Sequence, residues 1–291
     1  MTQRPGLLHV EMVMGLPVRI DVRDPEVGQT AVAEAVAWLH RVDAVFSTYK
    51  ADSDISRLNR GELAADDPAA DPELAPVLRR CRELREPTGG FFDAWATAAA
   101  ADGWGGEGDR RDPSVLLPGA VDPSGLVKGW AVERAGRILA AHGARNWSIN
   151  AGGDIVLRGD ALPERGWRVG IQHPQRPDAV AAVIEAAGGL AVATSGLYER
   201  GDHVLDPRTG RPPQGVLSVT VCGDDLGTAD AYATAALAMG LDGPEWSAAL
   251  PGYEALTLLA DGRELSTPGF PFAPGTGPQP APRVQLRIQR G

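Results

Sequence analysis

The sequence predicts an α+β protein in which antiparallel sheets are flanked by helices. The first half contains long segments with apolar residues at helical spacing, and the second half contains short apolar runs separated by Gly and Pro. The links between the short runs are of hairpin length. Links of that length favour antiparallel pairing over a doubly wound parallel sheet.

The individual elements follow from these patterns. Residues 7–22 alternate apolar and polar side chains, which predicts a β-hairpin that turns at residues 15–17. Helical spacing predicts helices over 29–46, 72–86 and 124–142, with a short helix over 91–101 and an exposed loop over 102–120. The later segments predict strands over 147–158, 167–172, 179–185, 190–194, 216–222 and 253–259, and helices over 228–240 and near 244–249.

The chain divides into one domain and a tail. We expect residues 1–266 to form the domain and residues 267–291, which are rich in Pro and Gly, to form a C-terminal extension. Within the extension, residues 284–288 are apolar enough for an edge strand.

Composition restricts the classes of function. The 28 Lys and Arg against 38 Asp and Glu leave a net charge of −10, so the chain lacks the positive field of a general nucleic-acid or acidic-membrane binder. Binding of an anion then needs a local cation, and a metal would serve. No apolar run of about 18 residues is present, so we expect no transmembrane helix. No signal peptide or lipidation cysteine is visible near the start, which favours a cytoplasmic protein, although a trimmed exported form also fits.

The two cysteines, Cys81 and Cys222, have no CxxC partner, which excludes a thiolate zinc site. Their spacing leaves a disulfide open, and two reduced, partly buried thiols are the favoured interpretation.

Residues 229–239, ADAYATAALAM, contain a candidate metal half-site. On a helix Asp230 and Thr234 face the same way, and a carboxylate with a hydroxyl offers oxygen ligands to a hard cation such as Mg2+. The plainer alternative is that Asp230 caps the helix and Thr234 bonds a backbone carbonyl. The pair alone favours that alternative.

Two glycine-containing segments are candidates for ligand contact. In residues 121–132, VDPSGLVKGWAV, a Ser-Gly turn at the start of a helix suits an anion, and Lys128 could hold a phosphate. The alternative is a helix cap with a solvated lysine. In residues 150–154, NAGGD, two glycines within an apolar pattern indicate either a bulge at a ligand or a plain turn.

Two polar segments contain further candidates. His203 lies near Asp206 and Arg208 among turn residues, which makes a functional histidine as plausible as a structural one. Ser195 does not lie in a GxSxG elbow, so a serine hydrolase is poorly supported. In residues 46–59, FSTYKADSDISRLN, Tyr49 is a candidate stacking residue, and Ser53 or Asp54 is expected to cap a short helix.

Taken together, these segments resemble the ApbE family of FAD:protein FMN transferases. The matching runs, in family order, are MGLP (14–17), FSTYKADSDISRLN (46–59), TGGFFDA (88–94), VDPSGLVKGWAVE (121–133), NAGGD (150–154), WRVGIQHP (167–174), ATSGLYER (193–200), HVLDPRTGRP (203–212), SVTV (218–221) and ADAYATAALAMG (229–240). The resemblance covers about residues 10–260 and implies an ApbE-like architecture related to the T-fold.

The resemblance also implies an activity and a set of site residues. Such enzymes use Mg2+ to cleave FAD, release AMP and attach FMN through a phosphoester to a Ser or Thr of an acceptor protein. By this resemblance the catalytic residues are His203, as the base for the hydroxyl, and Asp230. The metal would be held by Asp230, Thr234 and the carbonyl of Gly125. The implied flavin contacts are Met14, Tyr49, Phe92, Asp93, Ala94, Asp122, Lys128 and Leu205.

Departures from the family pattern keep other functions open. Pro123, Ser124 and Val127 replace residues of the usual DLGGIAKG run, and the usual GAFDPT run reads GFFDAW. The two alternatives are an FAD pyrophosphatase, with water as the acceptor, and a flavin-binding protein without turnover.

Overall fold

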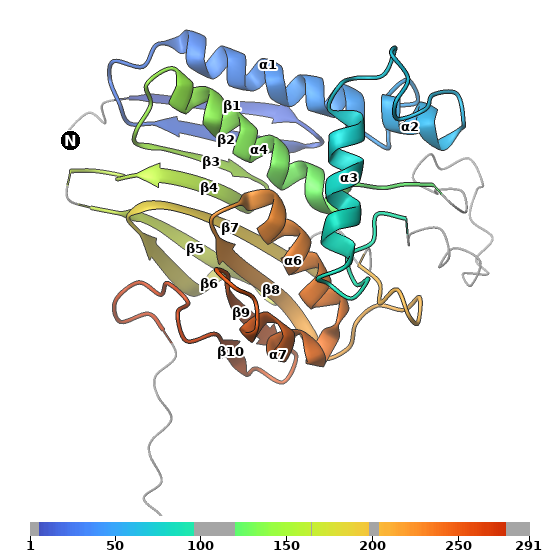
Figure 1. Cartoon of the computed structure of the whole chain (residues 1–291). Helices are drawn as coiled ribbons and strands as arrows, with labels where there is room; N and C mark the ends of the chain where they lie inside the picture. Colours follow the sequence, from blue (N-terminus) through green and yellow to red (C-terminus); the bar gives the residue numbers. More distant parts are fainter. Residues whose placement is uncertain (1–5, 96–119, 164, 198–203, 278–291) are drawn as a thin grey trace, which may run out of the picture.

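The computed structural model describes residues 6–95, 120–163, 165–197 and 204–277. Eight strands form one antiparallel sheet in the order β1-β2-β3-β4-β7-β8-β9-β10 (Figure 1). They are β1 (Leu7–Val13), β2 (Leu16–Val22), β3 (Trp147–Ala151), β4 (Asp154–Gly159), β7 (Gly188–Gly196), β8 (Val216–Gly223), β9 (Glu254–Leu259) and β10 (Glu264–Ser266). The expected α+β class with antiparallel pairing is confirmed.

Helices cover one face of this sheet (Figure 1). Three helices pack against the sheet: α1 (Gln29–Phe46), α4 (Ser124–Ala141) and α6 (Leu226–Ala238). The main hydrophobic core lies between these helices and the sheet. Nearly every residue of α6 is buried, because α6 lies between the sheet and its neighbouring helices. The shorter helices are α2 (Asp54–Asn59), α3 (Leu74–Arg85), η3 (Gly240–Asp242) and α7 (Gly243–Ala248).

A separate hairpin covers part of the opposite face. Strands β5 (Trp167–His173) and β6 (Arg176–Ala186) pair with each other and close a second core. The described part of the expected extension joins this core. Phe270 is buried there, and the N–H of Ala273 donates to the Val183 carbonyl of β6 at 2.7 Å.

Most predicted elements are confirmed. Some of their boundaries differ from the prediction at positions where local hydrogen bonds determine the start or end of an element. The first hairpin turns at Met14 and Gly15, because Leu16 and Pro17 already pair with β1. The single run predicted over 147–158 is two strands, since Gly152 and Gly153 form a two-residue turn with φ of +60° and +101°. The plain-turn interpretation of NAGGD is therefore correct for the backbone.

The short helix predicted over 91–101 is wrong for residues 91–95, which form bends and turns. The Thr88 hydroxyl accepts the N–H of Phe92 at 3.2 Å, and the Asp93 carboxylate accepts the N–H of Trp95 at 3.0 Å. These side chains offer the backbone an alternative to a helix. The remainder of that prediction, the loop over 102–119 and the strand over 284–288 lie outside the described residues.

Both cysteines are buried and unpaired, which confirms the expectation of reduced thiols. Burial raises the pKa of the Cys81 thiol to about 12, and burial likewise raises the pKa of Cys222. Within the described ranges, no helix combines the length and the apolar character needed to cross a bilayer.

Candidate functional site

Several predicted site residues meet at one end of the sheet. The β1–β2 turn, the β3–β4 turn and the end of β7 all lie at this end, as the register of the paired strands requires. A Cβ on Gly152 would lie 3.3 Å from a methyl group of Leu16, so the first two turns are in contact. The start of α4 lies over the same end, since the Lys128 ammonium reaches β4 there.

The close crossing of α4 and α6 brings together the three residues expected to hold a metal. A Cβ on Gly129 would lie 2.6 Å from the Leu226 carbonyl oxygen, so only glycine permits this approach. The N–H of Gly129 donates to Asp230 Oδ2 at 3.3 Å. One turn along α6, Thr234 faces Gly125, where a Cβ would lie 3.5 Å from Thr234 Oγ1.

The plainer interpretation of Asp230 and Thr234 is not what the structure shows. Asp225 caps α6 and accepts the N–H of Thr228 at 2.8 Å, so Asp230 lies inside the helix and is 3% exposed. The Thr234 hydroxyl lies 3.2 Å from the Ser195 hydroxyl at the end of β7.

The donor set at this crossing suits a hard cation. A carboxylate, a hydroxyl and a backbone carbonyl are the oxygen ligands that Mg2+ prefers. Gly125 leaves open the volume in front of Thr234 that a larger residue would fill. The described residues contain no cluster of three or more His, Cys, Asp or Glu able to bind a metal.

Lys128 is not the solvated lysine of the alternative interpretation. Its Nζ lies 2.7 Å from Asp154 Oδ2, and the Asp154 side chain is 1% exposed. Asp154 Oδ1 accepts the N–H of Thr194 at 3.2 Å, which ties this ion pair to β7 beside Ser195. Sequence reasoning missed Asp154 as a site residue. The available signal was a carboxylate directly after two glycines in the NAGGD run.

A second group surrounds the segment that leads into α4. The N–H of Asp122 donates to the Ala94 carbonyl at 2.7 Å, and the Asp122 carboxylate accepts the N–H of Ser124 at 2.9 Å. Asn59 of α2 bonds both the N–H and the carbonyl of Val121, at 2.8 and 2.9 Å. Sequence reasoning also missed Asn59, although it ends the polar run over 46–59.

Phe92 and Asp93 point in different directions. Phe92 is 4% exposed and lies against Gly125, where a Cβ would be 3.3 Å from its ring. The Asp93 carboxylate instead pairs with Arg85 Nε at 2.7 Å. The structure therefore places Phe92 beside the predicted metal residues and engages Asp93 with α3.

Three further predicted contacts lie in turns and loops. Met14 has φ of +55° in the β1–β2 turn and packs against the core. The Tyr49 side chain is 68% exposed, and Leu205 is half-buried. The Arg208 guanidinium lies 4.2 Å from the centre of the Phe91 ring, which joins the segment around Leu205 to the loop that contains Phe92. His203 lies outside the described residues.

Another buried carboxylate supports the helix crossing. Glu133 of α4 accepts the N–H of Leu226 at 3.4 Å and contacts Arg158 of β4 at 3.3 Å. Burial raises the pKa of Glu133 above its usual value. The contacts join α4 to both α6 and the sheet.

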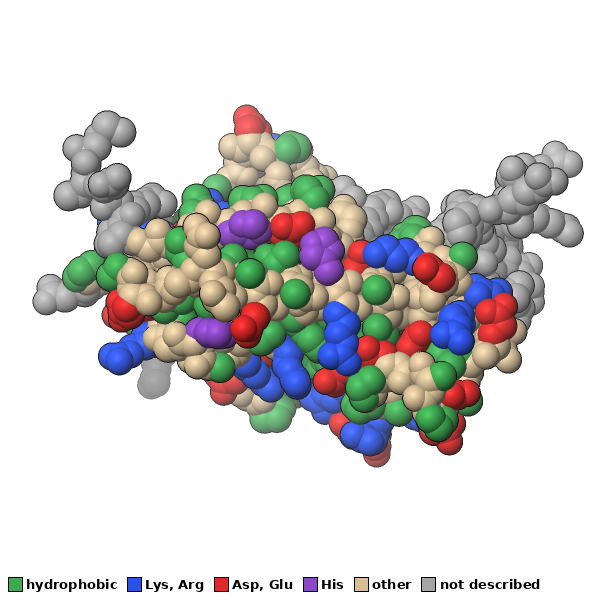
Figure 2. Space-filling model, turned by 90° about the horizontal axis from the view of Figure 1, so that it is seen from above, with side chains coloured by type: hydrophobic (Ala, Val, Ile, Leu, Met, Phe, Trp, Pro, Cys, Tyr) green, Lys and Arg blue, Asp and Glu red, His purple; other side chains and the backbone are tan. Residues whose placement is uncertain are grey.

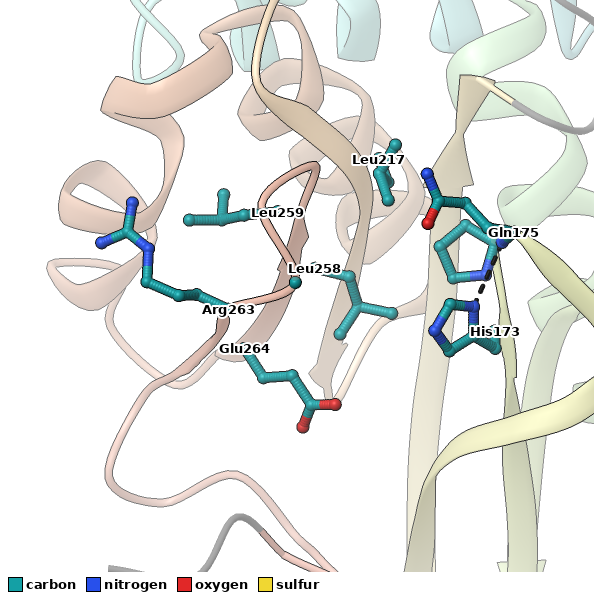
Figure 3. Close-up of a pocket in the computed structure, with 9 residues that line it drawn as sticks. His173, Gln175, Leu217, Leu258, Leu259, Arg263 and Glu264 are labelled. Carbon is teal, nitrogen blue, oxygen red and sulfur yellow. Dashed lines mark hydrogen bonds between the residues drawn. The ribbon is translucent and has the colours of Figure 1, made fainter. Parts of the chain in front are cut away.

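A small cavity lined by none of the predicted site residues lies between β9, the start of β10 and the β5–β6 turn (Figure 3). Its volume is about 40 Å³, and His173 at its rim accepts the N–H of Gln175 at 3.1 Å. Its size suits a water molecule rather than a nucleotide.

Comparison with known proteins decides the family. Residues 14–257 match the ApbE family. The chain belongs to the ApbE family. The match covers both turns of the site, the α4 segment and the α6 segment.

Individual relatives agree with this assignment. The chain is 33% identical to an FAD:protein FMN transferase of Rhodobacter capsulatus over 75% of this chain, and it spans about half of that relative, 48%. It is 29% identical to the FAD:protein FMN transferase of Vibrio cholerae, over 73% of this chain and 74% of the relative.

Solved structures share the ApbE fold of this chain. The flavin transferase ApbE from Vibrio cholerae superposes with a TM-score of 0.76 at 26% identity, covering 92% of this chain and 99% of that one. The ApbE protein of Thermotoga maritima superposes with a TM-score of 0.76 at 27% identity, covering 90% and 97%.

Proposed function

We propose that this ApbE-family chain is an Mg2+-dependent FAD:protein FMN transferase. The observation that supports the proposal is the α4–α6 crossing, where the Gly129 N–H donates to Asp230 Oδ2 at 3.3 Å and Thr234 lies against Gly125. The names of its relatives support the reaction class. The substrates are FAD and an acceptor protein with a Ser or Thr.

The proposed reaction is a phosphoryl-group transfer with a balanced exchange of bonds. The acceptor hydroxyl oxygen bonds to the phosphorus of the FMN half, and the bond from that phosphorus to the bridging oxygen breaks. AMP leaves with the electron pair. The hydroxyl proton passes to His203, because a histidine imidazole can act as a general base at neutral pH.

The chain's own residues have distinct tasks in this proposal. Asp230, Thr234 and the carbonyl of Gly125 would hold the cation, whose positive charge offsets charge on the pyrophosphate. Lys128 supplies a point charge that Asp154 holds in place at 2.7 Å. Phe92 offers an apolar wall beside Gly125.

The remaining predicted flavin contacts are Met14, Tyr49, Asp93, Ala94, Asp122 and Leu205. Of these, Tyr49 has its ring in solvent and available for stacking. Ala94 and Asp122 are hydrogen-bonded neighbours, so a ligand that contacts one would approach the other.

The test is incubation with FAD, Mg2+ and a candidate acceptor, followed by measurement of AMP and the intact mass of the acceptor. A Mg2+-dependent gain of one FMN on the acceptor supports the transferase. AMP with free FMN and no labelled acceptor would indicate the pyrophosphatase. Bound, uncleaved FAD would indicate a flavin-binding protein and would contradict the proposal.

Variants on α6 separate the metal site from the fold. Asp230→Ala should abolish AMP release with little change in circular dichroism, and Asp230→Asn should do the same while still accepting the Gly129 N–H. Asp225→Asn, at the cap of the same helix, keeps a cap acceptor and should retain turnover. Normal turnover in Asp230→Ala would refute the metal assignment.

His203→Ala tests the proposed base. Transfer should fall much more than FAD affinity, because the base acts on the acceptor hydroxyl rather than on bound FAD. An unchanged rate of acceptor labelling would remove His203 from this role.

A further inference from the structure

The first strand of the large sheet has an open edge. β1 ends the strand order and pairs with β2 on one side, and within the described ranges no strand pairs with its other side (Figure 1). Its seven residues, LLHVEMV, contain no Pro and no Lys, and its register with β2 has no bulge. Proline, lysine and β-bulges are features by which proteins ordinarily protect a long edge strand from pairing. Because β1 has none of these three, its edge is suited to pairing with another strand.

The side chains of β1 form an exposed apolar stripe on one face. Leu8, Val10 and Met12 are 60%, 57% and 65% exposed, and they alternate along the strand, so they share one face of the sheet. The intervening residues face the helices, because Glu11 contacts His40 of α1 at 3.0 Å. Three exposed apolar side chains on one face of an edge strand indicate a surface that is covered in the assembled protein.

The sequence of β1 is complementary to itself in the antiparallel direction. With a two-fold axis at Val10, each Leu8 lies opposite a Met12 of the second copy, and the two Val10 residues lie opposite each other. On the helix-facing side, each His9 lies opposite a Glu11 of the second copy. Within one chain His9 already contacts Glu11 at 3.1 Å, so imidazole and carboxylate are suited to the same pairing across an interface.

We propose that β1 is the interface with a second copy of this chain, formed by antiparallel β1–β1 pairing about a two-fold axis at Val10. This arrangement joins two eight-stranded sheets into one continuous sheet and places the two apolar stripes side by side on one face, where cross-strand neighbours contact each other. Figure 2 looks onto this edge beside α1, where histidine and acidic side chains lie among hydrophobic ones. The charge and apolar pattern of β1 favours a second copy over an unrelated strand. In an interface with two-fold symmetry the same segment occurs on both sides, so its sequence must be complementary to itself, as that of β1 is.

The first test is the oligomeric state of the full chain and two matched variants. Sedimentation equilibrium should give twice the 30.5 kDa of one chain, shifting to 30.5 kDa on dilution. Val10→Lys should shift the mass to that of one chain at all concentrations, since two ammonium groups would meet at the axis. Val180→Lys is the control: Val180 is 58% exposed but lies on β6, so this variant should remain a dimer.

The second test measures register by disulfide formation. Both native thiols are buried, so introduced cysteines can be followed without interference. Val10→Cys alone should form a covalent dimer on mild oxidation. Leu8→Cys and Met12→Cys should each remain largely without a covalent cross-link alone and should cross-link when mixed, because only that mixture places two thiols opposite each other.

Either of two oligomeric states would overturn the proposal, as would one cross-linking result. One is a monomeric chain at every concentration. The other is a dimer that Val10→Lys leaves intact. A dimer in which Leu8→Cys alone cross-links as well as the mixture would refute the two-fold register. Neither experiment involves FAD or Mg2+, so the outcome is independent of the proposed activity.

Discussion

Asp154→Asn tests whether the buried ion pair beneath the candidate site is essential to its geometry. Asp154 is 1% exposed in its side chain and lies 2.7 Å from Lys128 Nζ. The substitution removes the negative charge and keeps an oxygen that can still accept the N–H of Thr194. The substitution therefore alters the contact with Lys128 and leaves the hydrogen bond to Thr194 in place.

The expected loss follows from the burial of the two groups. Removing one partner of a fully buried ion pair costs about 3–5 kcal/mol, because the remaining charge loses its counter-charge where water solvates it poorly. Lys128 is 21% exposed and can turn its ammonium towards water, which lowers the penalty. We expect Asp154→Asn to reduce the free energy of unfolding by about 2–3 kcal/mol.

Urea unfolding at neutral pH measures this loss. The control is Asp261→Asn, which breaks an ion pair of similar length, 2.8 Å to Arg263, between side chains 54% and 65% exposed. That variant should be indistinguishable from the parent, since exposed pairs contribute little. The double variant Asp154→Asn/Lys128→Met should be more stable than Asp154→Asn alone, because it removes the ammonium that has lost the Asp154 carboxylate.

The reasoning fails if Asp154→Asn is as harmless as Asp261→Asn. It also fails if the stability loss of the double variant equals the sum of the losses of the two single variants. Losses in the free energy of unfolding add for independent residues and do not add for residues that interact.

Three further predictions concern the fold. Burial raises the pKa of Asp24, but N–H donors from residues 145–146 outweigh this effect and hold its pKa below the usual value. Its stabilisation is therefore complete above the unfolded pKa of about 4 and is lost as the pH falls through the folded pKa, so Asp24→Asn should flatten the acid side of a plot of stability against pH. Gly129→Ala would place a Cβ 2.6 Å from a backbone oxygen of α6 and should cost about 3 kcal/mol, whereas Gly170→Ala, whose nearest contact would be 3.6 Å, should cost little by thermal unfolding. The two buried thiols should resist iodoacetamide in the folded protein and react fully in urea, as intact mass would show, and rapid alkylation of the folded chain would contradict their burial.

Local patterns were enough to predict much of the architecture. The helix predicted over 29–46 is α1, Gln29–Phe46, because its apolar residues recur at a single helical period. Asp230 and Thr234 were placed on one face of a helix by the same argument, and of the two expected caps of α2, Ser53 and Asp54, the observed one is Ser53. The family resemblance then assigned roles that no single motif could support.

Other features depend on contacts between residues distant in the sequence. Periodicity could not show that α6 begins at Leu226, since this start depends on Asp225 as the cap. It also could not pair Lys128 with Asp154, or Asn59 with Val121, 62 residues away. A side chain's rotamer and partner are set by packing, which the local sequence does not encode.

The sequence by itself determined the α+β class, the order of most elements and the residue types available for chemistry, because these depend on the periodicity and turn propensity of neighbouring residues. The tertiary structure decided which of those residues meet. It brought Gly125, Asp230 and Thr234 to one helix crossing, turned Asp93 towards Arg85, and left the stripe of β1 exposed. These outcomes depend on how two helices and a sheet pack in three dimensions, where a glycine such as Gly129 allows an approach that no local pattern reveals.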